Sequence, residues 1–156
     1  MKLQVYKLRK NAKLPQRAHR TDAGADLFYC PDGKKKLYDC TEDFYIPPGN
    51  SRILPTGLKF EVPTGFMLEI KNKSGIAVKR QLLVGACVVD SGYDGEVFVN
   101  LHNVGPHTQV IKPGAKIAQA ILISVECCEI EEVLDASILN IESTRGAGAL
   151  GSTGIR

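Results

Sequence analysis

The clearest alternation in the sequence is LKFEVPTGFMLEIK, which spans residues 58–71. Apolar and polar or charged side chains alternate on both sides of Pro63-Thr64-Gly65, and a period of two residues is typical of a strand with one buried face. Proline and glycine at the centre favour a tight turn. We therefore expect two antiparallel strands that are joined as a hairpin by this turn.

Similar short strands are indicated along most of the chain. Residues 96–103 and 116–125 are rich in β-branched or aromatic side chains, and turn residues such as Lys112-Pro113-Gly114 separate such segments. Only residues 74–80 predict a short helical turn. This pattern favours an all-β, antiparallel sandwich or barrel of short strands. We expect one domain of this kind over residues 1–142, followed by a glycine-rich, flexible arm over residues 143–156.

Composition excludes several classes of function. The 156 residues include 20 Lys+Arg and 17 Asp+Glu, which give a net charge of only +3, and aromatic residues make up 6% with no tryptophan. Neither figure favours a nucleic-acid partner. The chain has no apolar run of about 18 residues and no signal-peptide core, so we expect no membrane partner and a cytoplasmic location, or a nuclear one in a eukaryotic host. The five cysteines and three histidines show no zinc-binding spacing.

The segment GACVVDSGYDG, residues 85–95, runs an apolar strand into a carboxylate and then turns through glycines. Desolvation at the end of such a strand raises the pKa of a carboxyl group, which makes Asp90 a candidate general base. Tyr93 stands where its ring could lie flat against a substrate. The alternative is an ordinary β-turn in which Asp and Gly are turn formers.

Two further segments combine glycines with polar side chains. Lys73-Ser74-Gly75 offers a cation, a hydroxyl and an exposed N–H group, which suit either a phosphate oxygen or a helix cap. The tail from Arg145 places donors among glycines, which suit a phosphate or a frayed end. It is not a Walker A loop, because Ser152 stands where that motif has lysine.

Two more polar groups lie in or beside predicted strands. Gln119 shares strand parity with Ile117 and Ile121, so its amide needs a partner, either a substrate or another chain. Asp22 and Asp26 flank Gly24, which by itself is only a weak metal or turn signal.

In this order and spacing, five segments of the chain resemble the five motifs of the trimeric dUTP pyrophosphatases (dUTPases). They are Ala23–Leu27, Lys73–Ala77, Gly85–Gly95, Gly114–Gln119 and Arg145–Gly154. The resemblance implies a β jelly roll, or distorted β-barrel, and a homotrimer whose three active sites lie at subunit interfaces. It also implies hydrolysis of dUTP to dUMP and pyrophosphate with Mg²⁺, which limits uracil in DNA and supplies dUMP for thymidylate synthesis.

The resemblance assigns roles to individual residues. Asp90, Gln119 and Ser74 would form the catalytic group, with Asp90 activating the attacking water. Asp26 and Gln119 would act on Mg²⁺ through its bound water, while substrate phosphates hold most of the ion. The substrate-binding residues would be Lys73, Ser74, Gly75, Gly85, Ala86, Cys87, Val88, Val89, Tyr93, Arg145, Leu150, Gly151, Ser152 and Thr153, with the C-terminal arm closing over the active site.

The chain departs from the family pattern at two positions that concern the substrate. Lys73 replaces an arginine and lacks its bidentate fork, and Leu150 replaces the aromatic residue that caps uracil. A dUTPase-like nucleotide-binding or regulatory protein with little or no catalysis is therefore an alternative. A dCTP deaminase is less favoured, because Asn100 stands where that family carries its glutamate.

Overall fold

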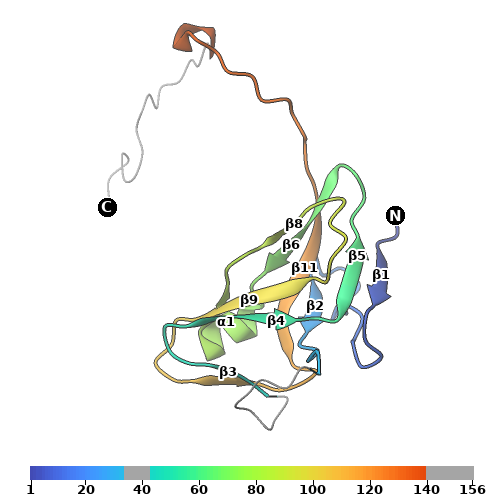
Figure 1. The fold of residues 1–156 in the computed structure, drawn as a ribbon, viewed down its shortest axis with the longest axis vertical. Helices are drawn as coiled ribbons and strands as arrows, with labels where there is room; N and C mark the ends of the chain where they lie inside the picture. The colour runs from blue at the N-terminus through green and yellow to red at the C-terminus, as the bar shows by residue number, and fades with distance from the viewer. Residues whose placement is uncertain (34–42, 140–156) are drawn as a thin grey trace. The chain divides into compact units, whose positions relative to one another are not determined.

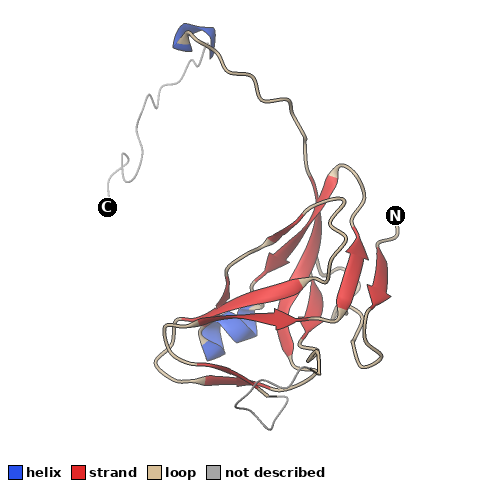
Figure 2. Ribbon diagram, viewed as in Figure 1, coloured by secondary structure: helices blue, strands red, loops and turns tan. Residues whose placement is uncertain are grey.

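The computed structural model describes residues 1–33 and 43–139, and it consists mainly of short strands (Figures 1 and 2). The strands are β1 (Gln4–Lys7), β2 (Ala25–Phe28), β3 (Phe44–Ile46), β4 (Ser51–Pro55), β5 (Leu58–Glu61), β6 (Phe66–Lys71), β7 (Leu82–Val84), β8 (Val88–Val89), β9 (Phe98–Asn103), β10 (Gln109–Ile111) and β11 (Lys116–Ser124). Within the described residues, α1 (Ser74–Arg80) is the one α-helix. The expected all-β class is confirmed, as is the short helix.

The chain divides into two compact units. Residues Met1–Glu126 form the first and contain every strand found in residues 1–33 and 43–139; the second begins at Cys127, and its described part contains a short 3₁₀-helix, Ala136–Leu139. The expected domain boundary at residue 142 and the arm over residues 143–156 lie outside the described residues. No helix of the described part is both long and apolar enough to cross a membrane.

Two antiparallel sheets provide most of the core. Their strand orders are β2-β11-β6-β8 and β4-β9-β7, and the pairs β1-β5 and β10-β3 complete the set. In Figure 1 β9 passes in front of β11, with the strands of the two sheets running across one another. Alternate side chains of both sheets point inward into one apolar cluster, because strand residues alternate between the two faces. Its fully buried members include Leu27, Leu54, Leu68, Ile70, Val99, Leu101 and Ile117.

The hairpin predicted around residues 63–65 is wrong, although the turn itself forms. The N–H of Phe66 donates to the carbonyl of Pro63 at 3.1 Å, and Gly65 has a φ of 80°. However, β5 pairs with β1, whereas β6 pairs with β11 and β8. The turn is therefore a corner between sheets. Turn residues determine the local reversal, but the pairing partner depends on packing around the shared core.

The strand parity predicted for Gln119 holds toward Ile121 but is wrong toward Ile117. The register of β11 against β2 shifts between Lys116 and Ala118, so that Ile117 and Ala118 are both buried. A β-bulge of this kind breaks the two-residue alternation. Beyond it, Gln119 stands opposite Asp26 on β2 and Lys71 on β6. The bulge thus moves the amide off the face of Ile117 and places Gln119 between Asp26 and Lys71.

Candidate active site

One part of the candidate site is a charged cluster formed by Asp26, Lys73, Lys116 and Gln119. Asp26 lies on β2 with only 4% of its surface exposed. Its Oδ1 accepts a hydrogen bond from the ammonium of Lys73 at 2.8 Å, and its Oδ2 pairs with that of Lys116 at 2.7 Å. Burial raises the pKa of the Asp26 carboxyl, but the two ammonium groups lower it by more, so its pKa lies below the ordinary value. The carboxylate is therefore held ionised.

Gln119 joins this cluster through strand register. On β11 it stands opposite Asp26 of β2, and its Nε2 donates to the carbonyl of Asn72 at 2.9 Å. Gly24 makes room for it, because a Cβ on that residue would lie 2.1 Å from Gln119 Oε1. The glycine of the first motif is thus required by the glutamine of the fourth. The amide N–H thus has its partner within the same chain, whereas the sequence predicted a partner in a substrate or in another chain.

Lys73 and Ser74 lie where β6 gives way to α1. The carbonyl of Lys73 accepts from the N–H groups of Ile76 and Ala77, both at 2.9 Å, which closes the first turn of the helix. At the other end Arg80 anchors α1 by donating to the carbonyl of Val110 at 2.7 Å. Ser74 is exposed, and open space surrounds the Cα of Gly75. The start of α1 at Ser74 and Gly75 is therefore uncovered in the single chain.

The segment Gly85–Val89 carries the chain from one sheet to the other. The N–H of Gly85 donates to the carbonyl of Asn100 at 3.0 Å, and the carbonyl of Cys87 accepts from Ile70 at 2.7 Å. Gly85 has no space for a side chain, since a Cβ there would lie 2.2 Å from Asn100 Oδ1 and 2.3 Å from His102 Nε2. The segment thus offers backbone groups near the surface, while its position is fixed at both ends.

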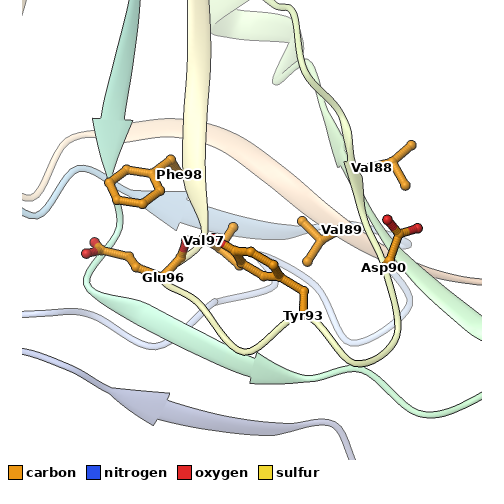
Figure 3. Close-up of a pocket in the computed structure, with 7 residues that line it drawn as sticks. All are labelled: Val88, Val89, Asp90, Tyr93, Glu96, Val97 and Phe98. Atoms are coloured by element: carbon orange, nitrogen blue, oxygen red, sulfur yellow. Dashed lines mark hydrogen bonds between the residues drawn. The ribbon is translucent and has the colours of Figure 1, made fainter.

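The second part of the candidate site is an open pocket of about 220 Å³ (Figure 3). It is lined by Val88, Val89, Asp90, Tyr93, Glu96, Val97 and Phe98. The N–H of Tyr93 donates to the carbonyl of Asp90 at 3.2 Å, and Gly92 between them has a φ of 85°, which favours glycine. This turn brings Asp90 and Tyr93, the two residues singled out in the sequence, to the same pocket.

The desolvation expected at Asp90 is not present in the single chain. Asp90 is exposed, and β8 before it has one exposed and one half-buried valine. The strand is short and pairs only through Leu68 and Glu69 of β6. A run of apolar letters therefore does not establish burial here, because β8 lies at the edge of its sheet.

The structure groups the predicted residues into these two parts. No hydrogen bond or ion pair between described residues joins the charged cluster to the open pocket. Lys116 belongs to the charged cluster, but the sequence did not lead us to predict it as a site residue. The available signal was its position, a cation three residues before Gln119. The predicted residues of the tail, Arg145, Leu150, Gly151, Ser152 and Thr153, lie outside the described residues.

The donor set in the described residues suits a metal only through water. Those residues contain no group of three or more His, Cys, Asp or Glu side chains that could hold an ion. Asp26 and Gln119 stand opposite one another on β2 and β11, and carboxylate and amide oxygens suit the water molecules around a hydrated Mg²⁺. The structure therefore fits an ion whose direct ligands come from elsewhere, such as phosphate oxygens.

Sequence comparison finds relatives over nearly the whole chain. A dUTPase family model matches residues 10–154. The chain is 40% identical over 157 residues to the deoxyuridine 5'-triphosphate nucleotidohydrolase of Gloeothece citriformis, covering 99% of this chain and 98% of that protein. It is 38% identical over 154 residues to the protein of the same name from Clostridium tetani, covering 97% and 96% respectively.

Solved structures show the same fold. A mutant of the Staphylococcus bacteriophage 80alpha dUTPase with dUpNHpp matches with a TM-score of 0.82 and 24% identity over 99% of each chain. A dUTPase from phage phi11 of S. aureus, described with a structural Mg(II) ion, matches with a TM-score of 0.74 and 23% identity over 86% of this chain and 98% of that one. These likenesses confirm the expected β jelly roll.

Proposed function

The chain belongs to the dUTPase family, and on that premise we propose that it is a dUTP diphosphatase, which hydrolyses dUTP to dUMP and pyrophosphate. The structural observation that carries this proposal is the pocket shared by Asp90 and Tyr93. A carboxylate that can take a proton and a ring that can lie against a sugar are thus within one site. The reaction would lower dUTP, and so uracil in DNA, and would supply dUMP for thymidylate synthesis.

In this proposal Asp90 acts on the attacking water. The carboxylate orients the water and takes its proton while the water oxygen forms a bond to the α-phosphorus. The bond from that phosphorus to the bridging oxygen breaks, and pyrophosphate leaves on the opposite side. The exposed position of Asp90 in the single chain leaves its carboxylate accessible to water and nucleotide.

The charged cluster would manage the triphosphate. Bound Mg²⁺ supplies positive charge that offsets the charge building up on the phosphate oxygens. Asp26 and Gln119 would accept hydrogen bonds from the water around the ion, and Lys73 with Ser74 would hold phosphate oxygens. Lys116 would keep Asp26 paired if Lys73 moves to the phosphates, since the two lysines contact different oxygens of that carboxylate.

The open pocket would select the nucleoside. The Tyr93 ring would lie under the deoxyribose and exclude a 2′-hydroxyl, and backbone groups of Gly85–Val89 would contact uracil. Val88 and Phe98 are 55% and 44% exposed, so apolar surface is available there. The C-terminal arm, with Leu150 in place of an aromatic residue, would close over this side.

We further propose a homotrimer in which each active site combines parts of different chains. The charged cluster and the open pocket are both fixed locally, yet no hydrogen bond or ion pair between described residues joins them. A neighbouring chain could place its charged cluster beside the pocket of the first. Sedimentation should then give about three times the chain mass of 17.0 kDa; a monomer with full activity would exclude the shared site.

The deciding experiment measures pyrophosphate release from dUTP, UTP, dTTP and dCTP with Mg²⁺. We expect rapid turnover of dUTP alone. Tight binding of dUTP without turnover would instead identify a nucleotide-binding or regulatory protein. Release of ammonia from dCTP would identify a deaminase, but the side chain of Asn100 contacts His102 Nε2 at 2.9 Å and the carbonyl of Arg52 at 3.3 Å, and it offers no carboxylate.

A further inference from the structure

Glu96 belongs to the open pocket by its position, but its side chain leaves it. Figure 3 shows the Glu96 carboxylate extending away from Asp90. There Oε1 accepts from the N–H of Gly57 at 2.7 Å and pairs with the guanidinium of Arg9, and Oε2 accepts from Arg9 Nη1 at 3.1 Å. A bidentate pair of this kind fixes orientation as well as distance.

Arg9 extends this contact to another part of the fold. Its Nη2 also donates to the carbonyl of Cys30 at 3.2 Å, at the end of the β2 segment. The side chains of Arg9 and Glu96 are only 21% and 14% exposed, so water screens the pair weakly. Hydrogen bonding to Glu96 raises the pKa of Arg9 despite its burial. The ion pair therefore ties the pocket loop to three segments that are distant in sequence.

The backbone of the same glutamate holds the Tyr93 ring. The Tyr93 hydroxyl donates to the carbonyl of Glu96 at 3.0 Å. Gly95 lies directly beneath it, because a Cβ there would be 2.3 Å from that hydroxyl oxygen. The position of the ring thus depends on where Glu96 places its carbonyl, and Glu96 is anchored by Arg9.

We propose that Glu96 and Arg9 are positioning residues that set the Tyr93 ring and, through it, the discrimination between deoxyribose and ribose. The inference rests on the proposed function, since it concerns the nucleoside that this pocket would select. A small displacement of the ring would open space for a 2′-hydroxyl. Loss of the ion pair should therefore lower the ratio of kcat/KM for dUTP to kcat/KM for UTP, because the pocket would then accept a ribonucleotide more readily.

The same loop contains a matched control. Asp94 forms an ion pair with Lys59, but its side chain is 84% exposed and that of Lys59 is 37% exposed. Solvent-exposed pairs contribute little to structure. Asp94→Asn removes a charge two residues from Glu96 without touching the buried pair or the Tyr93 hydroxyl. It should leave the selectivity for deoxyribose unchanged.

The experiment compares kcat/KM for dUTP and UTP in the full-length protein and in Glu96→Gln, Arg9→Lys, Gly95→Ala and Asp94→Asn. Glu96→Gln keeps an acceptor for Gly57 but loses the charge, and Arg9→Lys keeps the charge but loses the fork. Gly95→Ala displaces the ring directly. We expect the dUTP/UTP ratio to fall roughly ten-fold in the first three variants and to stay at the wild-type value in the fourth.

The ratio separates positioning from a general structural role. A merely structural defect would lower kcat/KM for both nucleotides and leave their ratio unchanged, which would overturn the inference. A fall in Asp94→Asn equal to that in Glu96→Gln would also overturn it. If Glu96→Gln fails to fold, Arg9→Lys decides by the same ratio. Failure of the wild-type protein to turn over dUTP would refute the proposed function, a result distinct from an unchanged ratio in active variants.

Discussion

The charged cluster and the open pocket differ in how far a single chain completes them. Asp26 is 4% exposed and both its carboxylate oxygens are paired, whereas Val88, Tyr93 and Phe98 in the pocket are 55%, 47% and 44% exposed. The charged cluster forms because the register between β2 and β11 places Asp26 and Gln119 opposite one another, so its geometry follows from the sheet. The open pocket is formed largely by the loop that follows the short edge strand β8, and one side of the pocket is open.

This difference indicates where further surfaces are needed. In the charged cluster both carboxylate oxygens of Asp26 are already paired, so the groups that it would still take are phosphate and a hydrated cation. The pocket exposes apolar side chains that would be buried favourably by nucleoside and by neighbouring protein. A homotrimer with shared sites would supply that cover. Substitution of the pocket carboxylate should therefore lower turnover with little loss of stability, whereas substitution of the cluster carboxylate should lower stability as well as turnover.

The largest effect should come from Asp90→Asn. Because Asp90 is exposed and lies in a turn, the amide should be accommodated without loss of fold. Removal of the base should lower kcat by about 10²–10⁴-fold while binding of dUpNHpp remains close to that of the wild-type protein. Single-turnover kinetics and calorimetric titration measure the two quantities. Near-normal turnover in the variant would show that Asp90 is not the base.

Asp26→Asn should affect both activity and stability. It removes the negative charge and one of the two oxygens that accept from the lysines, so we expect turnover to fall roughly ten- to a hundred-fold, as for groups that act on a metal through its water. The free energy of unfolding should fall by about 1.5–3 kcal/mol, the scale of hydrogen bonds to charged groups. Asp22→Asn, which alters a carboxylate that accepts from the exposed His19 N–H, is the matched control. Equal losses in both variants would refute the role of the charged cluster.

The stability difference should also depend on pH in a defined direction. Since the folded protein lowers the pKa of Asp26, the unfolded chain binds the proton more readily than the folded one. The contribution of Asp26 is therefore complete above the ordinary aspartate pKa of about 4 and is lost as pH falls through the lowered pKa. Urea unfolding of wild type and Asp26→Asn should differ at pH 7 and converge in strong acid. A difference that grows on acidification would contradict the ion-pair explanation.

The sequence predicted the strands and the residue types of the site better than their partners. Alternation located β5 and β6, but it could not show that they pair in different sheets. The bulge at Lys116–Ala118 could not be predicted from a period of two, and it is what places Gln119 opposite Asp26. Motif order identified Asp90 and Tyr93, whereas exposure at an edge strand depends on what lies beside it. The Arg9–Glu96 pair joins residues 87 positions apart, which no local pattern signals.

The smallest predicted effect concerns Lys73→Arg, which sharpens the comparison from the side of the charged cluster. Lysine reaches Asp26 with a single ammonium, while a guanidinium could contact the carboxylate and a phosphate oxygen with different N–H groups. We expect KM for dUTP to fall about two- to five-fold, the scale of one added hydrogen bond, with little change in kcat. Lys71→Arg is the control, because that neighbouring lysine pairs with Glu69 at 2.6 Å and lies outside the charged cluster. A change in kcat rather than KM would mean that Lys73 acts on the transition state, and the cluster would then share the chemistry now assigned to the open pocket.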